Sequence, residues 1–386
     1  MLRIAAIGLG ARLSLITSQL CTNHEDVRLV AVADPDQQSV LAHMKHHKLS
    51  EDDVKFYDSA NQMLEYADQF DGIMIGTQCH LHTPMAIKIP PTNLPLFLEK
   101  PVAISHDQAH QLANAYRGNE HRVIVSFPLR VTPVFNTAMD IIRSGRLGTI
   151  NQLQAYNNVS YGGAYYGQWY REYDRTGGLW LQKATHDFDY LTQIVACPPR
   201  SVTAMMTQKI YGGDKPHDLR CSACDETATC PESPQAHKRR DDTAGMDSDD
   251  HWCVYGSKIK NQDAGSAIIR YEDDTIVSYD QNFASRRTAA KRGVIVTGYD
   301  ATMEFGWYPS QVHVIDHHSS RVDHIECPAY GSHGGGDDPL IHAFVNMMRD
   351  KQPGVADLKD GLLSVAMCLA ARDSCENQSV EKISCP

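Results

Sequence analysis

Short apolar runs alternate with amphipathic stretches along the first 125 residues. Amphipathic stretches at 36–47 and 106–116 have the periodicity of helices. The apolar runs have the length and composition of buried strands, and they lie at 3–9, 27–34, 72–77, 94–101 and 121–127. This alternation predicts βαβ units and a parallel sheet over residues 1–125.

The pattern changes after Phe127. One helix is expected from residue 132 to Gly145, followed by alternating strands with few helices between them. Two strand-like runs around a polar turn at 268–280 predict an antiparallel hairpin. Helical periodicity returns in the last fifty residues, where a helix is expected to begin at Asp337 or Asp338.

Residues 126–386 are therefore predicted to form an α+β domain built on a large, open, mainly antiparallel sheet. A polar, cysteine-rich excursion interrupts it at 211–255. The C-terminal helices are candidates to pack back on the first domain.

Composition and charge narrow the functional classes. The chain has 386 residues, 42% of them hydrophobic, and a net charge of −11, which argues against a general nucleic-acid or anionic-membrane binder. No apolar run is long enough to predict a membrane-spanning helix, and Gly8 and Gly10 interrupt the apolar N-terminus where a signal peptide would continue. A cytoplasmic protein with reduced cysteines is expected.

A glycine-rich turn follows the first predicted strand and precedes a helix. In "AAIGLGARLS", Gly8 permits a tight turn and Gly10 lets a pyrophosphate approach the helix N-terminus. Leu13 occupies the third position of the usual glycine fingerprint, which is expected to loosen the fit of helix on strand. The candidate dinucleotide contacts in this turn are Gly8, Gly10, Ala11, Arg12 and Leu13.

Asp34 ends the second predicted strand. A carboxylate at this position accepts hydrogen bonds from the adenine ribose diol and repels a 2′-phosphate, so NAD is favoured over NADP. Arg12 would soften that preference. The alternative interpretation is a glycine-rich turn and a strand-end aspartate that bind no ligand.

Glu99, Lys100 and Pro101 stand at the end of another buried strand. Ligands of a doubly wound sheet bind outside the carboxyl ends of the strands, so Lys100 is expected at the cofactor cleft. A partly desolvated lysine there can hydrogen-bond a substrate hydroxyl and stabilise developing negative charge. A surface lysine at a strand end is the alternative.

Several motifs together resemble one known family. They are Gly8-x-Gly10, Asp34, Thr77 followed by His82, Glu99-Lys100-Pro101, Arg130 with Pro133, Gly145-x-x-Gly148, Gly177-Gly178 and His186-x-x-Asp189. In this order and spacing, the chain resembles the glucose-fructose oxidoreductase / inositol dehydrogenase / MocA (Gfo/Idh/MocA) family of NAD(P)-dependent oxidoreductases. The resemblance implies a Rossmann domain, a second domain with a large open sheet, and hydride transfer at a sugar or cyclitol carbon. It also implies cofactor contacts at Thr77, His82 and Glu99.

The segment "GGLWLQKATHDFDYL", residues 177–191, predicts a buried helix with Lys183 and His186 one turn apart. Taken alone, it fits a snorkelling lysine and a histidine bonded to the backbone. The resemblance implies instead that His186 relays the substrate's hydroxyl proton. This chain has Gln182 where the family often has an aspartate, so Lys183 is the candidate charged partner. Asp189 is expected to support the helix or to orient His186.

These assignments describe the oxidation of an alcohol. Nicotinamide would take the hydride, His186 would take the proton as general base, and Lys100 would polarise the oxygen. Sugar contacts are expected among Arg130, Tyr161, Tyr165, Trp169, Arg171, Arg175, Gln182, Lys183 and His186.

Two other functions fit the same residues. One is an NAD-dependent glycoside-cleaving enzyme that acts by transient sugar oxidation, elimination and re-reduction. The other is a catalytically silent sugar-nucleotide sensor, against which Lys100 and His186 argue. Net formation of NADH separates the dehydrogenase from the glycosidase.

Four cysteines in the excursion have the spacing of a metal site. Cys221-x-x-Cys224, with Cys230 and Cys253, predicts a closed, structural zinc site. Alternative ligands are His217, His237 and His251, and the alternative to metal binding is a set of reduced, unligated thiols.

The predicted hairpin at 265–281 carries apolar residues in both registers, including Ala267, Ile268 and Ile269. One buried face does not need so many. An exposed apolar sheet face predicts a homo-oligomer, either a dimer or a tetramer.

Overall fold

The computed structural model describes residues 1–242, 245–246, 249–350 and 352–386. The chain divides into two compact units, each formed by segments that are far apart in the sequence. The first comprises Met1–Pro133, Tyr330–Ala366 and Ser384–Pro386, and the second comprises Val134–Ala329 and Met367–Ile383. The division passes through the long helix α12 (Leu358–Asn377).

A six-stranded parallel sheet forms the centre of the first unit, as the alternation of strands and helices predicts. Its order is β3-β2-β1-β4-β5-β6, so the chain winds in opposite directions from β1. The carboxyl ends of β1 and β4 form the switch point at which such sheets bind ligands. The strands are β1 (Leu2–Leu9), β2 (Val27–Ala33), β3 (Lys55–Tyr57), β4 (Gly72–Gly76), β5 (Leu96–Leu98) and β6 (Val123–Val125).

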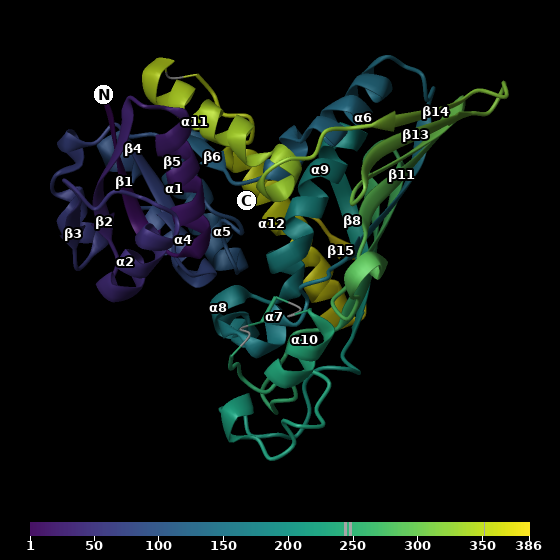
Figure 1. The fold of residues 1–386 in the computed structure, drawn as a ribbon. Coiled ribbons are helices and arrows are strands. Elements are labelled where there is room, and N and C mark those ends of the chain that lie inside the picture. Colours follow the sequence, from purple (N-terminus) through teal and green to yellow (C-terminus); the bar gives the residue numbers. More distant parts are fainter. Residues whose placement is uncertain (243–244, 247–248, 351) are drawn as a thin grey trace. The chain divides into compact units, whose positions relative to one another are not determined.

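Helices cover this sheet (Figure 1). They are α1 (Ala11–Asn23), α2 (Gln37–His46), α3 (Ala60–Leu64), α4 (His82–Ala86), α5 (His106–Ala115) and α11 (Asp337–Asp350). Helices α2 and α5 confirm the two amphipathic predictions, and α11 begins at Asp337 as expected. Helix α11 packs against α1, because its apolar face (Leu340, Ile341, Phe344, Val345) shares one core with Leu13, Ile16 and Leu20.

The second unit is built on a nine-stranded sheet of order β14-β13-β12-β11-β7-β10-β9-β8-β15. Among the described strands of this sheet, only β7 and β10 pair in parallel, and the predicted hairpin is confirmed as β9 and β10. The strands are β7 (Ile150–Asn158), β8 (Pro199–Thr207), β9 (Ala264–Tyr271), β10 (Ile276–Asn282), β11 (Arg292–Gly298), β12 (Ala301–Trp307), β13 (Ser310–Asp316), β14 (Val322–Glu326) and β15 (Glu381–Lys382).

The helices of this unit are α6 (Pro133–Arg143), α7 (Ala164–Gly167), α8 (Tyr173–Thr176), α9 (Thr185–Val195) and α10 (Pro234–Arg240). Helix α6 ends two residues before the predicted stop at Gly145. The helix predicted at 177–191 is not uniform, since a π-helical turn at Trp180–Ala184 precedes α9. The excursion between β8 and β9 contains α10, and residues 243–244 and 247–248 of it lie outside the described residues.

One face of the large sheet carries α6 and α9, as Figure 1 shows. On the hairpin, Ala267 and Ile269 are buried, whereas the intervening Ile268 is 53% exposed. Further exposed apolar side chains on the strands of this sheet are Met205, Met206, Ile276, Ile315 and Val322. Successive side chains of a strand point to opposite faces, so the apolar residues of the hairpin lie partly on the covered face of the sheet and partly on its exposed face.

Candidate active site

The turn after β1 has the backbone that a nucleotide-binding turn requires. Gly8 has φ of +74°, and an added Cβ would lie 2.6 Å from the Thr77 methyl carbon. Any larger residue would therefore be strained and would clash with β4's carboxyl end. At Gly10, an added Cβ would meet no atom of the described residues within 4 Å, so the start of α1 is open to a ligand.

Leu13 does not loosen the packing of α1 on the sheet, contrary to our expectation. Leu13 is 1% exposed, and its Cβ would lie 2.6 Å from a Cβ added at Gly76. The close approach that a glycine on the helix usually allows is here allowed by a glycine on β4. The missing third glycine is thus compensated by the neighbouring strand.

Asp34 is fixed at the end of β2 by the backbone around it. Its carboxylate accepts hydrogen bonds from the backbone N–H groups of Leu9, at 3.1 Å, and Asp36, at 2.9 Å. The bond from Leu9 joins the carboxylate directly to the glycine-rich turn. The structure therefore brings together the two features from which the sequence predicts NAD binding.

Arg12 is held by two carboxylates within the first unit. Its guanidinium donates to both oxygens of Asp337 and lies 3.3 Å from Glu99 Oε1. Burial would lower the Arg12 pKa, but these carboxylates raise it, and Arg12 with His333 holds the pKa of the Asp337 carboxyl well below its usual range. Arg12 is therefore engaged by acidic groups, and Asp337 is a site residue that the sequence pattern missed. The sequence marks Asp337 as the start of a helix, but that position is 325 residues from Arg12, so nothing local links the two.

His82 links the turns that follow β4 and β5. One ring nitrogen lies 2.7 Å from the carbonyl oxygen of Pro101 and the other 2.9 Å from that of Thr77. The ring is buried, and burial lowers its pKa although both carbonyl contacts oppose the shift. Lys100, directly before Pro101, is half-buried at the carboxyl end of β5. His82 therefore positions the turn that carries Lys100.

Arg130, expected at the substrate, is anchored within the first unit. Its guanidinium donates to the Asp360 carboxylate at 2.8 Å and to the Val355 carbonyl at 3.0 Å. Arg130 is 8% exposed, and this pairing accounts for a buried cation. The geometry assigns it a role in joining residues 330–366 to the sheet.

In the second unit, the π-helical turn carries Lys183 and leads directly to His186. Both side chains are 5% exposed. The Lys183 amine donates a hydrogen bond to the hydroxyl of Tyr161 and lies 4.1 Å from the centre of that ring. π-helical turns occur frequently at functional sites. The snorkelling alternative is wrong for Lys183, because its amine is held in the interior by a tyrosine.

Burial and the nearby Arg292 guanidinium together lower the pKa of Lys183 to about 7, although Asp187 opposes the shift. This lysine therefore changes its charge near neutral pH. An unfolded lysine titrates near 10.4. Between about pH 7 and that value the unfolded chain binds more protons, so this group makes folding more favourable as the pH rises.

A buried network beside His186 was missed from the sequence. Asp187 is fully buried and accepts hydrogen bonds from Asn157, Tyr190, Tyr279 and Arg292, at 2.9, 2.6, 2.8 and 2.8 Å. The buried Arg292 guanidinium balances its charge. The network holds the first turn of α9 against β7, β10 and β11. Arg292 lies 105 positions from Asp187, so no local signal announces the network.

The remaining candidates of the segment 161–189 differ in how deeply their side chains are buried. Gln182 donates to the Thr176 carbonyl at 3.3 Å, Tyr165 lies in the core, and Trp169 stacks on Tyr170.

The two arginines of this segment differ in exposure: Arg171 is 1% exposed and contacts His217, whereas Arg175 is exposed. Asp189 is buried in α9. Tyr161, which is 45% exposed, is the candidate that joins Lys183 to the surface.

Two protein-family models match the chain. Residues 2–127 match the oxidoreductase family with an NAD-binding Rossmann fold, and residues 135–304 match the GFO/IDH/MocA C-terminal domain. The chain belongs to the Gfo/Idh/MocA family. It is thus an NAD-binding oxidoreductase with a Rossmann domain and a mixed-sheet domain, as the motifs predict.

Individual members of the Gfo/Idh/MocA family are distant in sequence. Inositol 2-dehydrogenase of Rhizobium meliloti is 24% identical over 265 residues, which are 66% of this chain and 73% of that protein. The rhizopine catabolism protein MocA of Rhizobium meliloti is 23% identical over 217 residues, 55% of this chain and 62% of that protein. A levoglucosan dehydrogenase in complex with NADH and L-sorbose has the same fold, with a TM-score of 0.78, 14% identity and coverage of 100% of this chain and 99% of that one.

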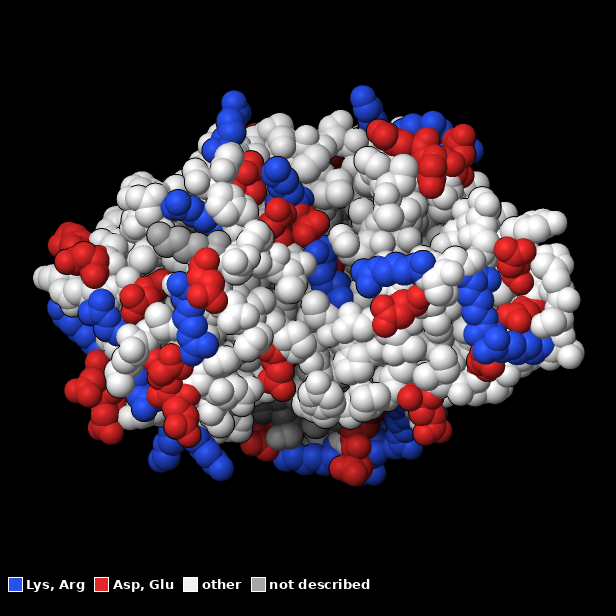
Figure 2. Space-filling view, turned by 90° about the horizontal axis from the view of Figure 1, so that it is seen from above, with Lys and Arg blue, Asp and Glu red and all other residues white. Residues whose placement is uncertain are grey.

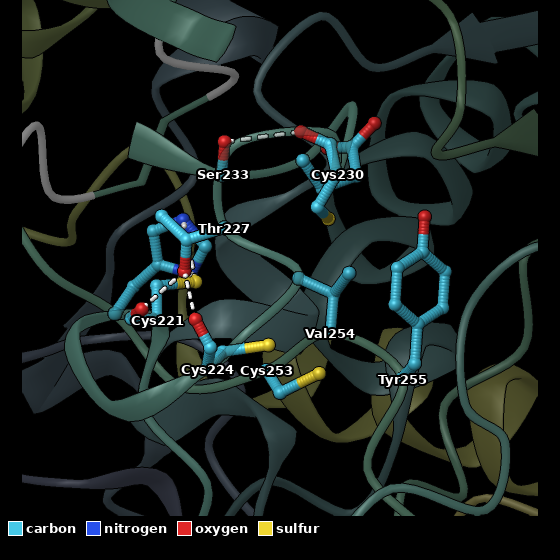
Figure 3. A pocket seen from close by; sticks show the side chains of 10 residues that line it. Cys221, Cys224, Thr227, Cys230, Ser233, Cys253, Val254 and Tyr255 are labelled. Carbon is cyan, nitrogen blue, oxygen red and sulfur yellow. Dashed lines mark hydrogen bonds between the residues drawn. The ribbon is translucent and has the colours of Figure 1, made fainter. Parts of the chain in front are cut away.

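The predicted zinc site is not supported by the structure. Cys221, Cys224, Cys230 and Cys253 do line one pocket of the excursion, together with His251 (Figure 3). In Figure 3, however, the sulfur of Cys230 lies apart from those of Cys224 and Cys253. A tetrahedral zinc site needs ligands that converge on one point, and among the described residues no three cysteine, histidine or acidic side chains do so.

Burial raises the pKa of three thiols of this pocket, those of Cys221, Cys230 and Cys253. Cys221 Sγ lies 3.6 Å from His251 Nδ1, and burial raises the pKa of Cys221 to about 12. Of the alternative ligands, His217 contacts Arg171 and Glu172, which are outside the pocket lining.

Acidic and basic side chains are mixed on the face of the protein in Figure 2, and its visible, described residues form no extended basic patch. This agrees with the net charge of −11. In the part of the chain that the structure describes, no helix combines the length and apolarity needed to cross a bilayer.

Asp34→Ala is expected to weaken NAD binding and to narrow the difference between NAD and NADP affinity, because both the diol contact and the repulsion of a 2′-phosphate disappear. Fluorescence titration with NADH and NADPH measures both affinities. Asp36→Ala, which alters the neighbouring turn and leaves the Asp34 carboxylate in place, is the matched control. Tighter binding of NADPH than NADH by the unchanged protein would contradict the assignment.

Proposed function

We propose that this enzyme is an NAD-dependent dehydrogenase that transfers a hydride between nicotinamide and a carbinol or carbonyl carbon of a sugar or cyclitol. The observation that carries the proposal is the pair Lys183 and His186, both buried on one helical segment in a chain of an NAD-binding family. Burying two titratable side chains costs free energy of folding, and proteins concentrate such groups at functional sites.

In this proposal His186 accepts the hydroxyl proton, since an imidazole is the side chain that ordinarily does so near neutral pH. Lys100 hydrogen-bonds the same oxygen and stabilises the negative charge that develops there. Bound NAD supplies the hydride acceptor. The Gly8–Leu13 turn and Asp34 hold the nucleotide, with Thr77, His82 and Glu99 shaping the turns around it.

Two features support a carbohydrate as the substrate. The inositol and levoglucosan dehydrogenases to which the chain is similar act on polyhydroxylated rings, by their names. The exposed Tyr161 beside Lys183 offers an aromatic face and a hydroxyl, which suit a ring of that kind.

The experiment that tests the function is incubation of the purified enzyme with NAD and a panel of sugars, cyclitols and glycosides. We expect NADH, followed by its absorbance, to form in proportion to the oxidised substrate. Release of an aglycone without net NADH would show the glycoside-cleaving alternative to be correct. Absence of both reactions with every polyol would contradict the proposal.

We also propose that residues 1–125 bind the nucleotide, that residues 126–386 bind the substrate, and that the enzyme works in the cytoplasm. The eleven described cysteines are all free thiols, which suits a reducing compartment.

The exposed face of the large sheet supports a further proposal, a homo-oligomer that buries Met205, Ile268 and Ile315. Light scattering at micromolar concentration should give the mass of two or four chains. Ile268→Glu is expected to lower that mass, whereas Glu304→Gln on the same sheet should not. A monomeric unchanged protein would contradict the proposal.

A further inference from the structure

Lys183 is a buried amine whose hydrogen-bond partner is a tyrosine at the surface. Its Nζ donates to the Tyr161 hydroxyl, and the centre of the Tyr165 ring lies 5.4 Å from it on another side. Lys183 is 5% exposed, whereas Tyr161 is 45% exposed. The two side chains therefore form a polar connection from a buried amine of the second unit to a tyrosine that is partly exposed.

The charges around the pair leave the amine free to lose and regain a proton. Asp187, an acidic group that acts on the Lys183 amine, is paired with Arg292, and among the described residues no carboxylate forms an ion pair with Lys183. The groups that face the pair are Arg292 from β11, Asp187 from α9, Tyr165 from α7 and Tyr308 after β12. Burial and Arg292 disfavour the ammonium form, so the pKa of Lys183 falls to about 7.

We propose that Lys183 and Tyr161 are a proton-transfer pair that carries the proton released from the substrate hydroxyl to solvent. This inference rests on the proposed dehydrogenase function. It assigns Tyr161 a role in proton transfer, where the sequence predicts only a sugar contact.

The transfer balances without a further reactant. Oxidation of the alcohol sends two electrons and one hydrogen nucleus to NAD as hydride and releases one proton. His186 takes that proton from the substrate and passes it to the neutral Lys183 amine, which becomes ammonium while the imidazole returns to its neutral form. The ammonium then donates a proton to the Tyr161 oxygen while the Tyr161 hydroxyl hydrogen passes to water. Both side chains end in their starting forms, and the reverse sequence supplies a proton for reduction.

Two variants test the pair. Lys183→Met keeps the aliphatic bulk and removes the amine, and we expect kcat for oxidation to fall by about 10²-fold, the lower end of general acid–base effects. We also expect the limb of the pH profile that rises near pH 7 to be lost. Tyr161→Phe removes one hydroxyl from an exposed side chain, and we expect kcat to become dependent on buffer concentration. Added imidazole should restore much of the rate in both variants by carrying the proton.

Tyr299→Phe, at an exposed tyrosine in the β11–β12 turn, is the matched control and should change neither the pH profile nor the buffer dependence. A sugar contact at Tyr161 or Lys183 would instead raise KM at unchanged kcat and pH profile. Unchanged profiles and no rescue by imidazole in both variants would overturn the inference.

A measurement without substrate separates this inference from the function. Acylation of lysines with acetic anhydride over a range of pH, read by mass spectrometry, gives the titration of the Lys183 amine. We expect its midpoint near neutrality, and we expect Tyr161→Phe to shift it. A midpoint equal to that of exposed lysines would overturn the pair even if NADH forms. A neutral midpoint in a protein that oxidises no polyol would show that the function, and not the titration of the pair, was wrongly assigned.

Discussion

His186→Gln should remove most of the turnover and leave NAD binding unchanged. If His186 takes the hydroxyl proton, its loss should lower kcat by about 10²- to 10⁴-fold, which corresponds to roughly 3 to 5 kcal/mol of barrier. Glutamine keeps a polar side chain of similar length but accepts no proton. Steady-state NADH formation measures kcat, and NADH fluorescence titration measures binding.

Lys100→Met is the companion test, because Lys100 is expected to polarise the oxygen from which His186 takes the proton. We expect a loss of kcat in the same range with NAD affinity retained. His318→Gln, at an exposed histidine after β13, is the control for the histidine substitution and should leave kcat unchanged. A fully active His186→Gln enzyme would end the assignment of His186 as the base.

Asp187→Asn is expected to have the largest effect on stability. The carboxylate is fully buried and faces the buried Arg292, so its neutralisation leaves a guanidinium without compensating charge. Breaking a buried ion pair in this way typically costs about 3–5 kcal/mol. The loss should be larger here than at an exposed pair such as Arg200–Asp274, where Asp274→Asn serves as the control.

Tryptophan fluorescence is a selective probe for this experiment. The four tryptophans, Trp169, Trp180, Trp252 and Trp307, all belong to the second unit, so their signal follows the unfolding of that unit during a urea titration. The double variant Asp187→Asn with Arg292→Met should recover part of the lost stability, because it removes the uncompensated cation. An Asp187→Asn protein with an unchanged urea midpoint would contradict the role of the network.

Much of the fold followed from the sequence because its signals are local. The turn containing Gly8 and Gly10, the hairpin of β9 and β10, and the start of α11 at Asp337 each depend on neighbouring residues. The periodicity of apolar residues therefore predicted a parallel sheet in the N-terminal part and a mainly antiparallel sheet after it. The motif around His186 located the helix correctly, although the π-helical turn before it depends on contacts that no periodicity records.

The residues that complete the site were decided by tertiary structure. Gly76 compensates for Leu13 across the α1–β4 contact, and Asp337 reaches Arg12 over 325 positions. The zinc prediction is not supported for a related reason: the four cysteines line one pocket, but a metal site also needs sulfur atoms that converge on one point, which the described residues do not show.

By itself, the sequence determined the kind of cofactor site and the family, because strand, glycine turn, helix and strand-end carboxylate are consecutive features of one βαβ unit. Only the tertiary structure decided which charged groups are available for chemistry. Arg12 and Arg130 are held by Asp337 and Asp360, whereas Lys183 is held by Tyr161 alone among its described hydrogen-bond partners. The physical reason is that a buried charge is set by the groups packed around it, and those groups come from segments distant in the chain.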